Sequence, residues 1–328
     1  MSNALRFPFI WDNHACLPLS DMAVQLDRLA VYRDAGVRIV SVNVGYGAMS
    51  AQTVLANLHG ARRWLADHAE HYRLISTADE AGSPDDRRLG VVFDIEGLDS
   101  LASQVELIDA FHDLGVRWLS LAYNASNALA GGCLDEDNGL TRAGRLVIEK
   151  LNAAGVVLCL SHVGERSSLE AIEASAKPVI FSHSNPARCH PHPRNISDRQ
   201  IGACAARGGV IGINGISVFL GTRQEMVEAC VDQLITLVDL VGPEYVGLGL
   251  DHVLDPSDLG PVLKSFPGLM VDDAAVETVP PTAIADIAER LSQRGLSDKA
   301  ITGILGENWL RIARACWHAP QRQELLVP

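Results

Sequence analysis

The sequence predicts a (β/α)₈ barrel that forms a single domain. Eight short apolar segments are spaced along the 328 residues, and a helix end followed by glycine and an apolar run recurs between them. No G-x-G-x-x-G follows the first apolar segment, and this argues against a doubly wound sheet that binds a dinucleotide. Barrels of this kind commonly hold about 200 to 400 residues in one domain.

The eight apolar segments are expected to be the barrel strands. They are nearly continuous in hydrophobic residues, as parallel strands are when both of their faces are covered. Their predicted ranges are Phe7–Trp11, Arg38–Val44, Gly90–Ile95, Arg117–Leu121, Val156–Leu160, Pro178–Phe181, Val210–Ile213 and Tyr245–Leu250.

Helices are expected before the strands, in segments of helical periodicity. The junctions read YRDAGVRIVSVNV, FHDLGVRWLSLAY, LNAAGVVLCLSH and AARGGVIGING, in which glycine tolerates the left-handed backbone that ends a helix. The helices upstream are predicted to begin after a hydroxyl side chain that can cap them: Ser20, Ser100, Thr141 and Ser197. A proline-rich stretch over residues 254–286 is expected to be a long loop or lid.

Composition narrows the class of protein. A formal net charge of −13 argues against nucleic acid as a partner, because binding phosphates needs clustered lysine and arginine. Seven cysteines without a C-x-x-C spacing fit a reducing compartment, so the cytoplasm is expected. No run of 18 apolar residues suggests a membrane span, so no membrane contact is predicted.

Side chains able to bind metal or move protons follow six of the eight predicted strands. They are His14 and Cys16, Glu96, Tyr123, His162, His183 and Asp251. Taken singly, His162 could be a loop histidine and Asp251 a helix cap. In a barrel, however, the carboxyl ends of all strands meet at one mouth, where active sites lie. Histidine and carboxylate donors gathered there suit a borderline cation such as Zn²⁺, so the sequence favours a metal centre.

The strand-end motifs together resemble the membrane (renal) dipeptidase family of metallopeptidases. The matching pieces run in order from Asp12 to Arg311: D-x-H, D-I-E-G, L-S-H-V, F-S-H-S-N with H-P-R-N-I-S-D, G-L-G-L-D and GILGENWLR. The resemblance implies a (β/α)₈ barrel with zinc, usually a homodimer, which hydrolyses dipeptides and often tolerates a D-residue on the carboxyl side.

The resemblance also implies a role for each strand-end residue. Glu96 would bridge two metal ions, His162 and His183 would complete one metal site, and His14 would bind the other. Asp251 would handle the proton, and Arg194 would hold the substrate carboxylate through a two-pronged hydrogen bond. His192 is expected to face solvent or to orient its loop.

Two positions depart from the family pattern. Cys16 stands where the family has the aspartate of a His-x-Asp pair, and it either ligates the first metal as a thiolate or leaves one metal ion per chain. Tyr123 stands where the family has a histidine that contacts the substrate carbonyl. A phenol can donate one hydrogen bond there but stays neutral at pH 7.

The sequence therefore predicts a zinc-dependent, dipeptidase-like hydrolase with one or two Zn²⁺ per chain. It would cleave an amide bond in a small substrate with a free carboxylate, through a water activated by the metal. A metal-dependent amidohydrolase acting on a C–N bond outside dipeptides is one alternative. The other is a family member with weakened catalysis that binds a metal or ligand.

Overall fold

The computed structural model describes residues 6–16, 26–83, 86–253, 269 and 276–318, and the predicted barrel is confirmed there. Eight parallel strands pair in the order β1-β2-β4-β5-β6-β7-β8-β9, and β9 pairs with β1 to close the barrel. Their bounds are β1 Trp11–Cys16, β2 Ile39–Tyr46, β4 Leu89–Glu96, β5 Val116–Ser120, β6 Val157–Cys159, β7 Ile180–Phe181, β8 Val210–Ile213 and β9 Val246–Leu248. Two short strands that the sequence did not predict, β3 (Tyr72–Leu74) and β10 (His252–Val253), pair with β4 and β1.

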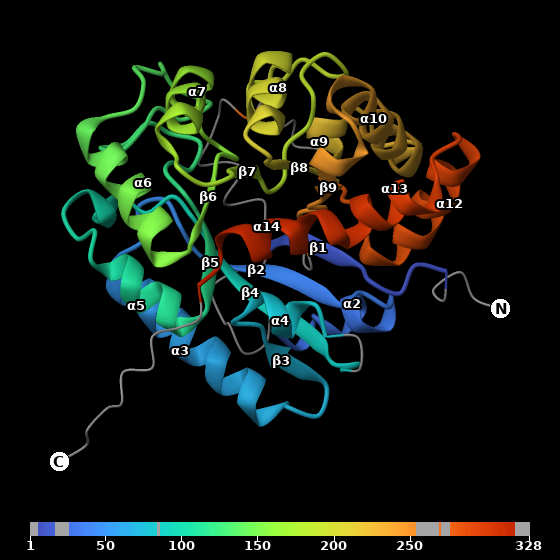
Figure 1. Cartoon of the computed structure of the whole chain (residues 1–328), viewed down its shortest axis with the longest axis horizontal. Coiled ribbons are helices and arrows are strands. Elements are labelled where there is room, and N and C mark those ends of the chain that lie inside the picture. Colours follow the sequence, from blue (N-terminus) through green and yellow to red (C-terminus); the bar gives the residue numbers. More distant parts are fainter. Residues whose placement is uncertain (1–5, 17–25, 84–85, 254–268, 270–275, 319–328) are drawn as a thin grey trace.

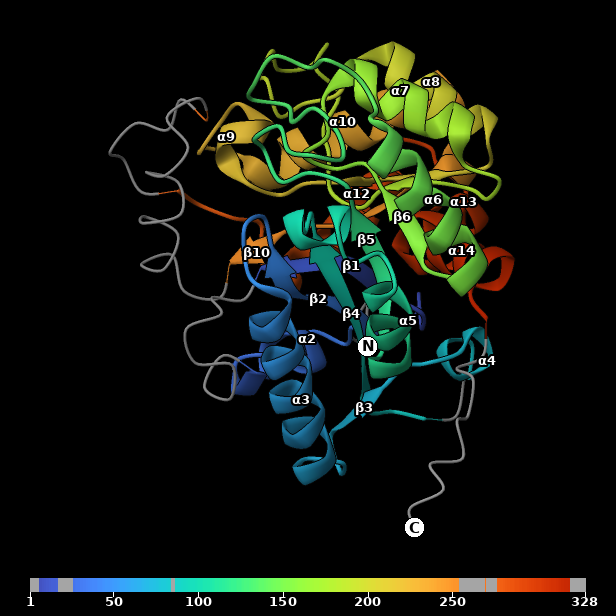
Figure 2. The same ribbon diagram turned by 90° about the vertical axis from the view of Figure 1, so that its left-hand side faces the viewer.

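Helices surround the strands (Figures 1 and 2). Their bounds are α2 Ala30–Asp34, α3 Ala51–Asp67, α4 Ala78–Ala81, α5 Leu107–Leu114, α6 Arg142–Ala154, α7 Glu165–Ala174, α8 Asp198–Ala206, α9 Ser217–Leu220, α10 Met226–Val241, α12 Ile284–Gln293, α13 Asp298–Thr302 and α14 Asn308–Cys316. Within the described ranges, none of these helices combines the length and the apolar character that crossing a membrane requires.

Local sequence explains where several helices begin and end. The Thr141 hydroxyl accepts the amide of Gly144 at the start of α6, and Ser197 forms a capping box with Gln200 at the start of α8. Gly115 and Gly155 end α5 and α6 in the left-handed conformation, as their junctions predict. Two predicted caps and helices therefore agree with the structure.

Other boundaries differ from the prediction. The helix expected directly after Ser100 is a 3₁₀ turn over Asp99–Ala102, and the α-helix begins only at Leu107. The cap expected at Ser20 lies outside the described residues, as does most of the predicted loop or lid over 254–286. The loop ends earlier than the predicted residue 286, because α12 already begins at Ile284.

The first strand is the largest correction. The sequence predicts Phe7–Trp11, whereas β1 spans Trp11–Cys16 and carries Asp12, Asn13 and His14 inside the sheet. These polar groups are buried but find partners there: Asp12 accepts the amide of Leu250, and Asn13 accepts the hydroxyl of Ser41. Burial of polar groups is tolerated where hydrogen bonds replace water. The apolar run alone therefore did not mark the bounds of the strand.

The barrel interior divides into two zones along the strands. At the amino ends, a cluster of apolar side chains includes Trp11, Trp118 and Trp309, with Trp309 contributed by α14. The Trp11 and Trp118 indoles both lie within hydrogen-bond distance of the Ser41 hydroxyl. Further along the same strands the inward residues become polar, and this change places the chemistry at the carboxyl ends.

A β-bulge in β1 marks the boundary between these zones. Asp12 pairs with Val40 and Ala15 with Val42, so three steps on β1 oppose two on β2. The extra residue shifts the alternation of side chains, and bulges commonly re-aim a side chain next to an active site. Trp11 packs in the apolar cluster before the bulge, and His14 reaches the carboxylates of β4 within it.

The segment from Gly303 to Arg311 fastens the last helix to the barrel. Asn308 donates to the carbonyl oxygens of Pro243 and Val246, both at 2.8 Å, and Trp309 donates to Leu248 at 3.0 Å. Gly306 is needed for close approach, because a Cβ there would lie 3.0 Å from the backbone nitrogen of Trp11. The late motif of the sequence thus has a structural role at the barrel's amino end.

Replacing Asn308 by alanine should lower the free energy of unfolding by about 1–3 kcal/mol, because the buried Val246 carbonyl and the partly buried Pro243 carbonyl lose their partner. Urea unfolding followed by tryptophan fluorescence measures the change. The control is Asn138→Ala, since Asn138 is exposed and should change stability by no more than about 0.5 kcal/mol. Equal stability of both variants would contradict this role of Asn308.

Candidate metal centre

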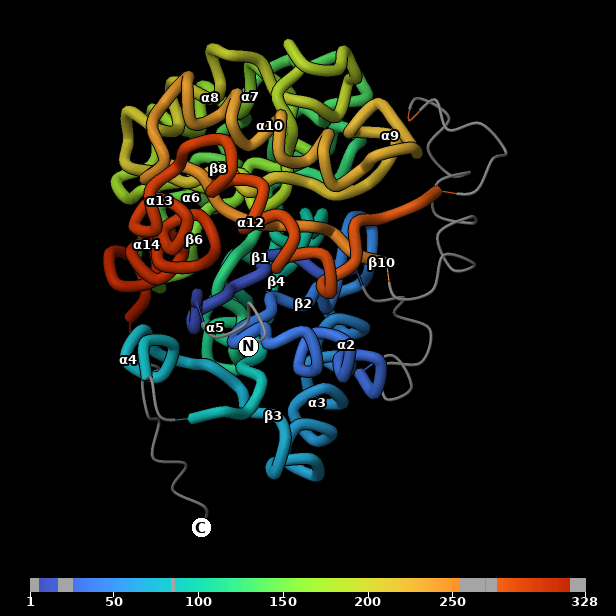
Figure 3. The backbone as a smooth tube through the Cα atoms, turned by 90° about the vertical axis from the view of Figure 1, so that its right-hand side faces the viewer, coloured from blue at the N-terminus to red at the C-terminus, as the bar shows by residue number. Residues whose placement is uncertain are grey.

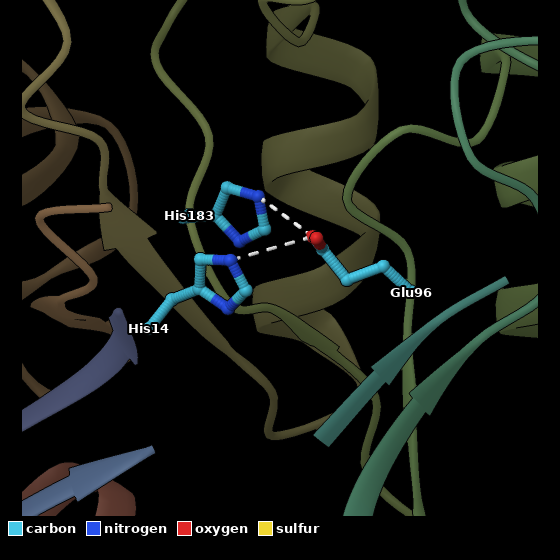
Figure 4. A group of neighbouring side chains, drawn as sticks. All are labelled: His14, Glu96 and His183. Carbon is cyan, nitrogen blue, oxygen red and sulfur yellow. Dashed lines mark ion pairs between the residues drawn. The ribbon is translucent and has the colours of Figure 1, made fainter. Parts of the chain in front are cut away.

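Glu96 stands at the centre of the histidine cluster, at the end of β4. Its Oε1 atom lies 2.9 Å from His162 Nε2, 3.1 Å from His183 Nε2 and 3.5 Å from His14 Nε2. All four side chains are buried. Figure 4 shows His14 and His183 both pointing toward this carboxylate oxygen. Their rings are stacked, with 3.9 Å between the centroids.

Each of these side chains comes from a different strand end. His14 lies in the bulge of β1, His162 follows β6 and His183 follows β7. Gly97 turns the chain immediately after Glu96, with a φ of +68° and no room for a Cβ, which would lie 2.6 Å from the Ala122 carbonyl carbon. The glycine of D-I-E-G is therefore required by the backbone.

Second partners orient two of the imidazoles. His183 Nδ1 lies 2.7 Å from the Ser182 hydroxyl, and His162 Nδ1 lies 2.7 Å from Asn124 Oδ1. Arg194 Nε also approaches His162 Nδ1, at 3.1 Å, but one nitrogen cannot both donate to Asn124 and accept from Arg194. The shorter contact favours Nδ1–H donated to Asn124, which leaves the Nε2 lone pair directed at Glu96.

A third partner orients His14. Its Nδ1 lies 3.4 Å from Asp94 Oδ2, and Asp94 also accepts from Asn43 Nδ2 at 3.1 Å. Asp94 sits two residues before Glu96 on β4, so both carboxylates face the same side of the strand. A carboxylate on one ring nitrogen of a histidine fixes the tautomer whose other nitrogen can ligate a metal.

The electrostatics of the cluster follow from burial and from these pairs. Burial would raise the pKa of Glu96, but the surrounding imidazoles of His14, His162 and His183 outweigh it and hold the pKa well below its usual value. Burial lowers the pKa of His162 to about 4, with Arg194 adding to the effect. His183 shifts in the same direction through burial and His14, so both imidazoles are neutral at pH 7.

His14 differs from the other two histidines. Burial opposes its charged form, but the carboxylates Glu96 and Asp94 outweigh burial and raise the pKa of His14 well above its ordinary value. The negative field of the centre thus comes chiefly from Glu96, since burial raises the pKa of Asp94, with His14 opposing that shift. Such a field attracts a cation as well as a proton.

These residues fit a divalent cation. The Nε2 atoms of His162 and His183 lie 3.0 Å apart, and both face the ionised Glu96 oxygen, so three atoms that can ligate a metal converge. Donors on one tetrahedral zinc ion, with bonds of about 2.0–2.2 Å, lie roughly 3.3 Å apart. His14, Glu96 and His183 also bring ligand atoms within 4.8 Å of one another.

The remaining predicted residues lie around this cluster. Asp251, after β9, has one oxygen 3.6 Å from His14 Nε2, and its other oxygen accepts from Asn214 at 2.8 Å. Burial raises the pKa of Asp251 to about 6, with His14 opposing the shift. The Tyr123 ring packs 4.5 Å from the His162 ring and 5.0 Å from the Tyr46 ring, measured between centroids.

Arg194 lies behind the histidines and is 2% exposed. Its Nη1 donates to the Ser184 hydroxyl and its Nη2 to the His183 carbonyl, both at 3.1 Å. His192 does not face solvent, which corrects half of the expectation for it. It is buried, contacts the Leu269 carbonyl at 3.0 Å and accepts the amide of Arg194, so it orients its loop.

Cys16 lies at the end of β1, half buried. It packs against an apolar cluster of Ile216, Phe219, Val253, Leu269 and Val276. In the part of the chain that the structure describes, the group of ligand atoms within 4.8 Å does not include its sulfur. Its ligation of a metal stays a prediction, as do the individual roles of the other site residues.

Sequence reasoning missed the residues that orient the histidines. Asp94, Asn124 and Ser182 are all buried beside a predicted ligand or directly behind one. The signal was present, because Asp94 precedes Glu96 by two strand positions, and Asn124 and Ser182 adjoin Tyr123 and His183. Only the fold shows that their polar atoms meet the imidazole nitrogens.

Comparison with protein families agrees with this geometry. The family model described as membrane dipeptidase (Peptidase family M19) matches residues 20–324. This chain belongs to the membrane dipeptidase family. The resemblance seen in the strand-end motifs is confirmed.

Individual relatives share between a fifth and a third of their aligned residues with this chain. The chain is 29% identical over 238 residues to dipeptidase tcpJ of Claviceps purpurea, a match that covers 71% of this chain and 52% of that relative. The chain spans about half the length of the curated relatives it matches. A crystal structure titled as an amidohydrolase from Pseudomonas aeruginosa aligns with a TM-score of 0.84 at 22% identity, covering 97% of this chain and 99% of that one.

A second solved structure is a metallopeptidase from Rhodobacter sphaeroides bound to a phosphinate mimic of the dipeptide L-Ala-D-Ala. It aligns with a TM-score of 0.74 at 20% identity, covering 94% of this chain and 99% of that one. At these identities the solved structures establish the shared fold. Together with the family, they agree with the (β/α)₈ barrel.

Replacing Ser182 by alanine should weaken metal affinity by about 10–100-fold, because the His183 ring loses the group that orients it. Competition with a chelating dye measures the affinity. The matched control is Ser120→Ala: this buried serine donates to the Ala122 carbonyl and is expected to leave metal affinity unchanged. Wild-type affinity in Ser182→Ala would refute the orienting role.

Proposed function

We propose that the chain is a zinc-dependent dipeptidase that cleaves the amide bond of a small substrate with a free carboxylate. The observation that carries the proposal is the convergence of Glu96 with three buried histidines at the mouth of the barrel, in a member of the dipeptidase family. The phosphinate mimic of L-Ala-D-Ala held by the Rhodobacter neighbour supports dipeptides as the substrate class.

Zinc is the proposed cation because the donors are imidazole nitrogens and carboxylate oxygens in a compact group. Glu96, His162, His183 and His14 would hold it, one or two ions per chain, with Cys16 as the candidate extra ligand. A divalent cation bound there polarises the substrate carbonyl and acidifies water at neutral pH.

Asp251 is the proposed proton carrier. Asn214 anchors one carboxylate oxygen, which leaves the other directed toward His14 and the ligand cluster. Burial raises the pKa of Asp251 to about 6, which lies close to neutral pH, where a carboxylate can both take and release a proton. Asp251 would therefore accept a proton from the attacking water and deliver it to the leaving amine.

Tyr123 is the proposed donor to the oxygen that gains charge as the amide bond breaks. Burial, followed by the charge of Glu96, raises the pKa of its phenol well above the ordinary value. The phenol therefore keeps its proton at neutral pH and can donate it in a hydrogen bond. One such donor is typically worth roughly 2.7 to 4 kcal/mol of transition-state stabilisation.

Arg194 is the proposed anchor for the substrate carboxylate. Its terminal nitrogens each carry two hydrogens, and their hydrogen bonds to Ser184 and to the His183 carbonyl use one apiece. The remaining two can form the paired hydrogen bonds that a carboxylate accepts. Because the guanidinium is held by its neighbours, little freedom is lost when the substrate binds.

A second candidate function keeps the metal chemistry and changes the substrate. Cys16 packs with apolar side chains and Tyr123 packs against Tyr46, so the surroundings of the centre are less charged than the His-x-Asp pattern of the family implies. Such a site could favour an N-acyl amino acid or a cyclic amide. The homodimer and the cytoplasmic location remain predictions.

The zinc-loaded protein should hydrolyse L-Ala-D-Ala or L-Ala-L-Ala, and it should act far more slowly on the corresponding dipeptide amides. The amide lacks the carboxylate that Arg194 would bind, so the loss should appear mainly in KM. Release of free amino acids, followed by chromatography, measures both rates. If no dipeptide in a broad panel is cleaved, the peptidase assignment fails.

The double substitution Cys16→Asp with Tyr123→His should raise kcat/KM for L-Ala-D-Ala by at least about tenfold, because it restores the carboxylate and imidazole of the family pattern. Steady-state kinetics with zinc added checks this, and each single variant serves as a control. A double variant that binds zinc but hydrolyses no dipeptide would favour the alternative that this protein is a family member that binds a ligand with weakened catalysis.

A further inference from the structure

A second cavity lies at the opposite end of the barrel from the metal centre. Its lining residues come just before β1, β2 and β4, or from the last turn and helix of the chain, so it opens at the amino ends of the strands. Its volume is about 550 Å³, within the range of about 300–1,000 Å³ typical of small-molecule sites. Figure 3 shows α4 and α14, which flank it, side by side.

Arginine dominates this cavity. Of the described side chains that line it, Arg38, Arg87, Arg311 and Arg314 are positive and Glu307 is the single negative one. This excess contrasts with a chain whose formal net charge is −13. Positive charge is therefore gathered locally, in a chain that is acidic elsewhere.

Among the residues that the structure describes, no carboxylate pairs with the two arginines at the edge of the cavity, Arg87 and Arg314. Asp86, next to Arg87 in the chain, pairs with Arg73 at 3.3 Å and with Arg88 at 2.6 Å. Among the described residues, neither Arg87 nor Arg314 has a carboxylate within 4.0 Å. Both are exposed, so their guanidinium groups can reach a ligand.

The deeper arginines add charge and shape. Arg311 donates to the carbonyl oxygens of Gly208 and Glu244, which holds its stem along the wall. Arg38 donates to the Asp86 carbonyl. Burial lowers the pKa of Arg38, and the nearby Arg87 and Arg73 lower it further, which reflects like charges held close together.

An apolar surface completes the cavity. Pro8, Phe9 and Leu310 line it beside the arginines. Phe9 is fixed from behind, because Gly306 packs so closely that a Cβ there would lie 2.9 Å from the Phe9 ring. The cavity thus combines an aromatic wall with guanidinium groups, and guanidinium binds phosphate oxygens in pairs.

We propose that this arginine pocket, lined by Phe9, Arg38, Arg87, Arg311 and Arg314, binds a small phosphate monoester. The phosphate lies between Arg87 and Arg314, where its two negative charges meet two exposed guanidinium groups. The organic part packs on Phe9 and Leu310. This site is separate from the metal centre, and the proposal does not depend on the dipeptidase activity.

Calorimetric titration of the metal-loaded protein with adenosine 5′-monophosphate, inorganic phosphate and adenosine tests the pocket. The nucleotide should bind with a Kd below about 1 mM, phosphate should bind more weakly, and adenosine should not bind measurably. Quenching of tryptophan fluorescence gives a second readout, because Trp309 adjoins Leu310 in α14. Absence of nucleotide binding, or phosphate binding as tightly as the nucleotide, would overturn the proposal.

The double variant Arg87→Gln with Arg314→Gln separates this pocket from the metal centre, which can also bind phosphate. It should weaken nucleotide binding at least about tenfold and leave peptidase activity unchanged. The control is Arg63→Gln with Arg142→Gln, which removes the same charge from exposed arginines outside the pocket and should keep wild-type affinity. Nucleotide affinity equal in wild type and Arg87→Gln/Arg314→Gln would place the ligand elsewhere and refute the site.

Discussion

One buried carboxylate oxygen organises the mouth of this barrel. Glu96 Oε1 lies within 3.5 Å of the Nε2 atoms of three histidines that come from three other strands. Two of these imidazoles are neutral, so the Nε2 atom of each can present a lone pair to the small volume that the carboxylate charge also faces. Such an arrangement is unfavourable unless a cation occupies it, and the orienting groups around it prevent the rings from turning away.

The rest of the fold maintains this arrangement. The bulge of β1 turns His14 into the centre, and Gly97 bends the chain directly after Glu96. Below the centre, the tryptophan cluster and the Gly303–Arg311 segment fill and close the amino end of the barrel. A rigid floor of packed side chains keeps ligands from different strands in register, because close-packed interiors resist small displacements.

Much of this arrangement could be predicted from the sequence, and the failures have physical causes. All eight predicted strands overlap barrel strands, the first one only at Trp11, because buried parallel strands are apolar along their whole length. The first strand was placed too early because Asp12, Asn13 and His14 interrupt its apolar run, and only long-range hydrogen bonds to Leu250 and Ser41 make their burial favourable.

The candidate site was also predicted only in part. Its histidines and carboxylates could be named because strand ends in a barrel converge. Asp94, Asn124 and Ser182 could not be, since their roles depend on which ring nitrogen each one meets. The buried position of His192 also depends on the distant Leu269 carbonyl, which local sequence does not reveal.

The most direct test of the central claim is anomalous X-ray diffraction at the zinc absorption edge, on crystals of the purified protein loaded with zinc. A peak is expected within about 2.0–2.2 Å of Glu96 Oε1 and of the Nε2 atoms of His162 and His183. The absence of a peak among these three atoms, with either imidazole turned away from the carboxylate, would contradict the account.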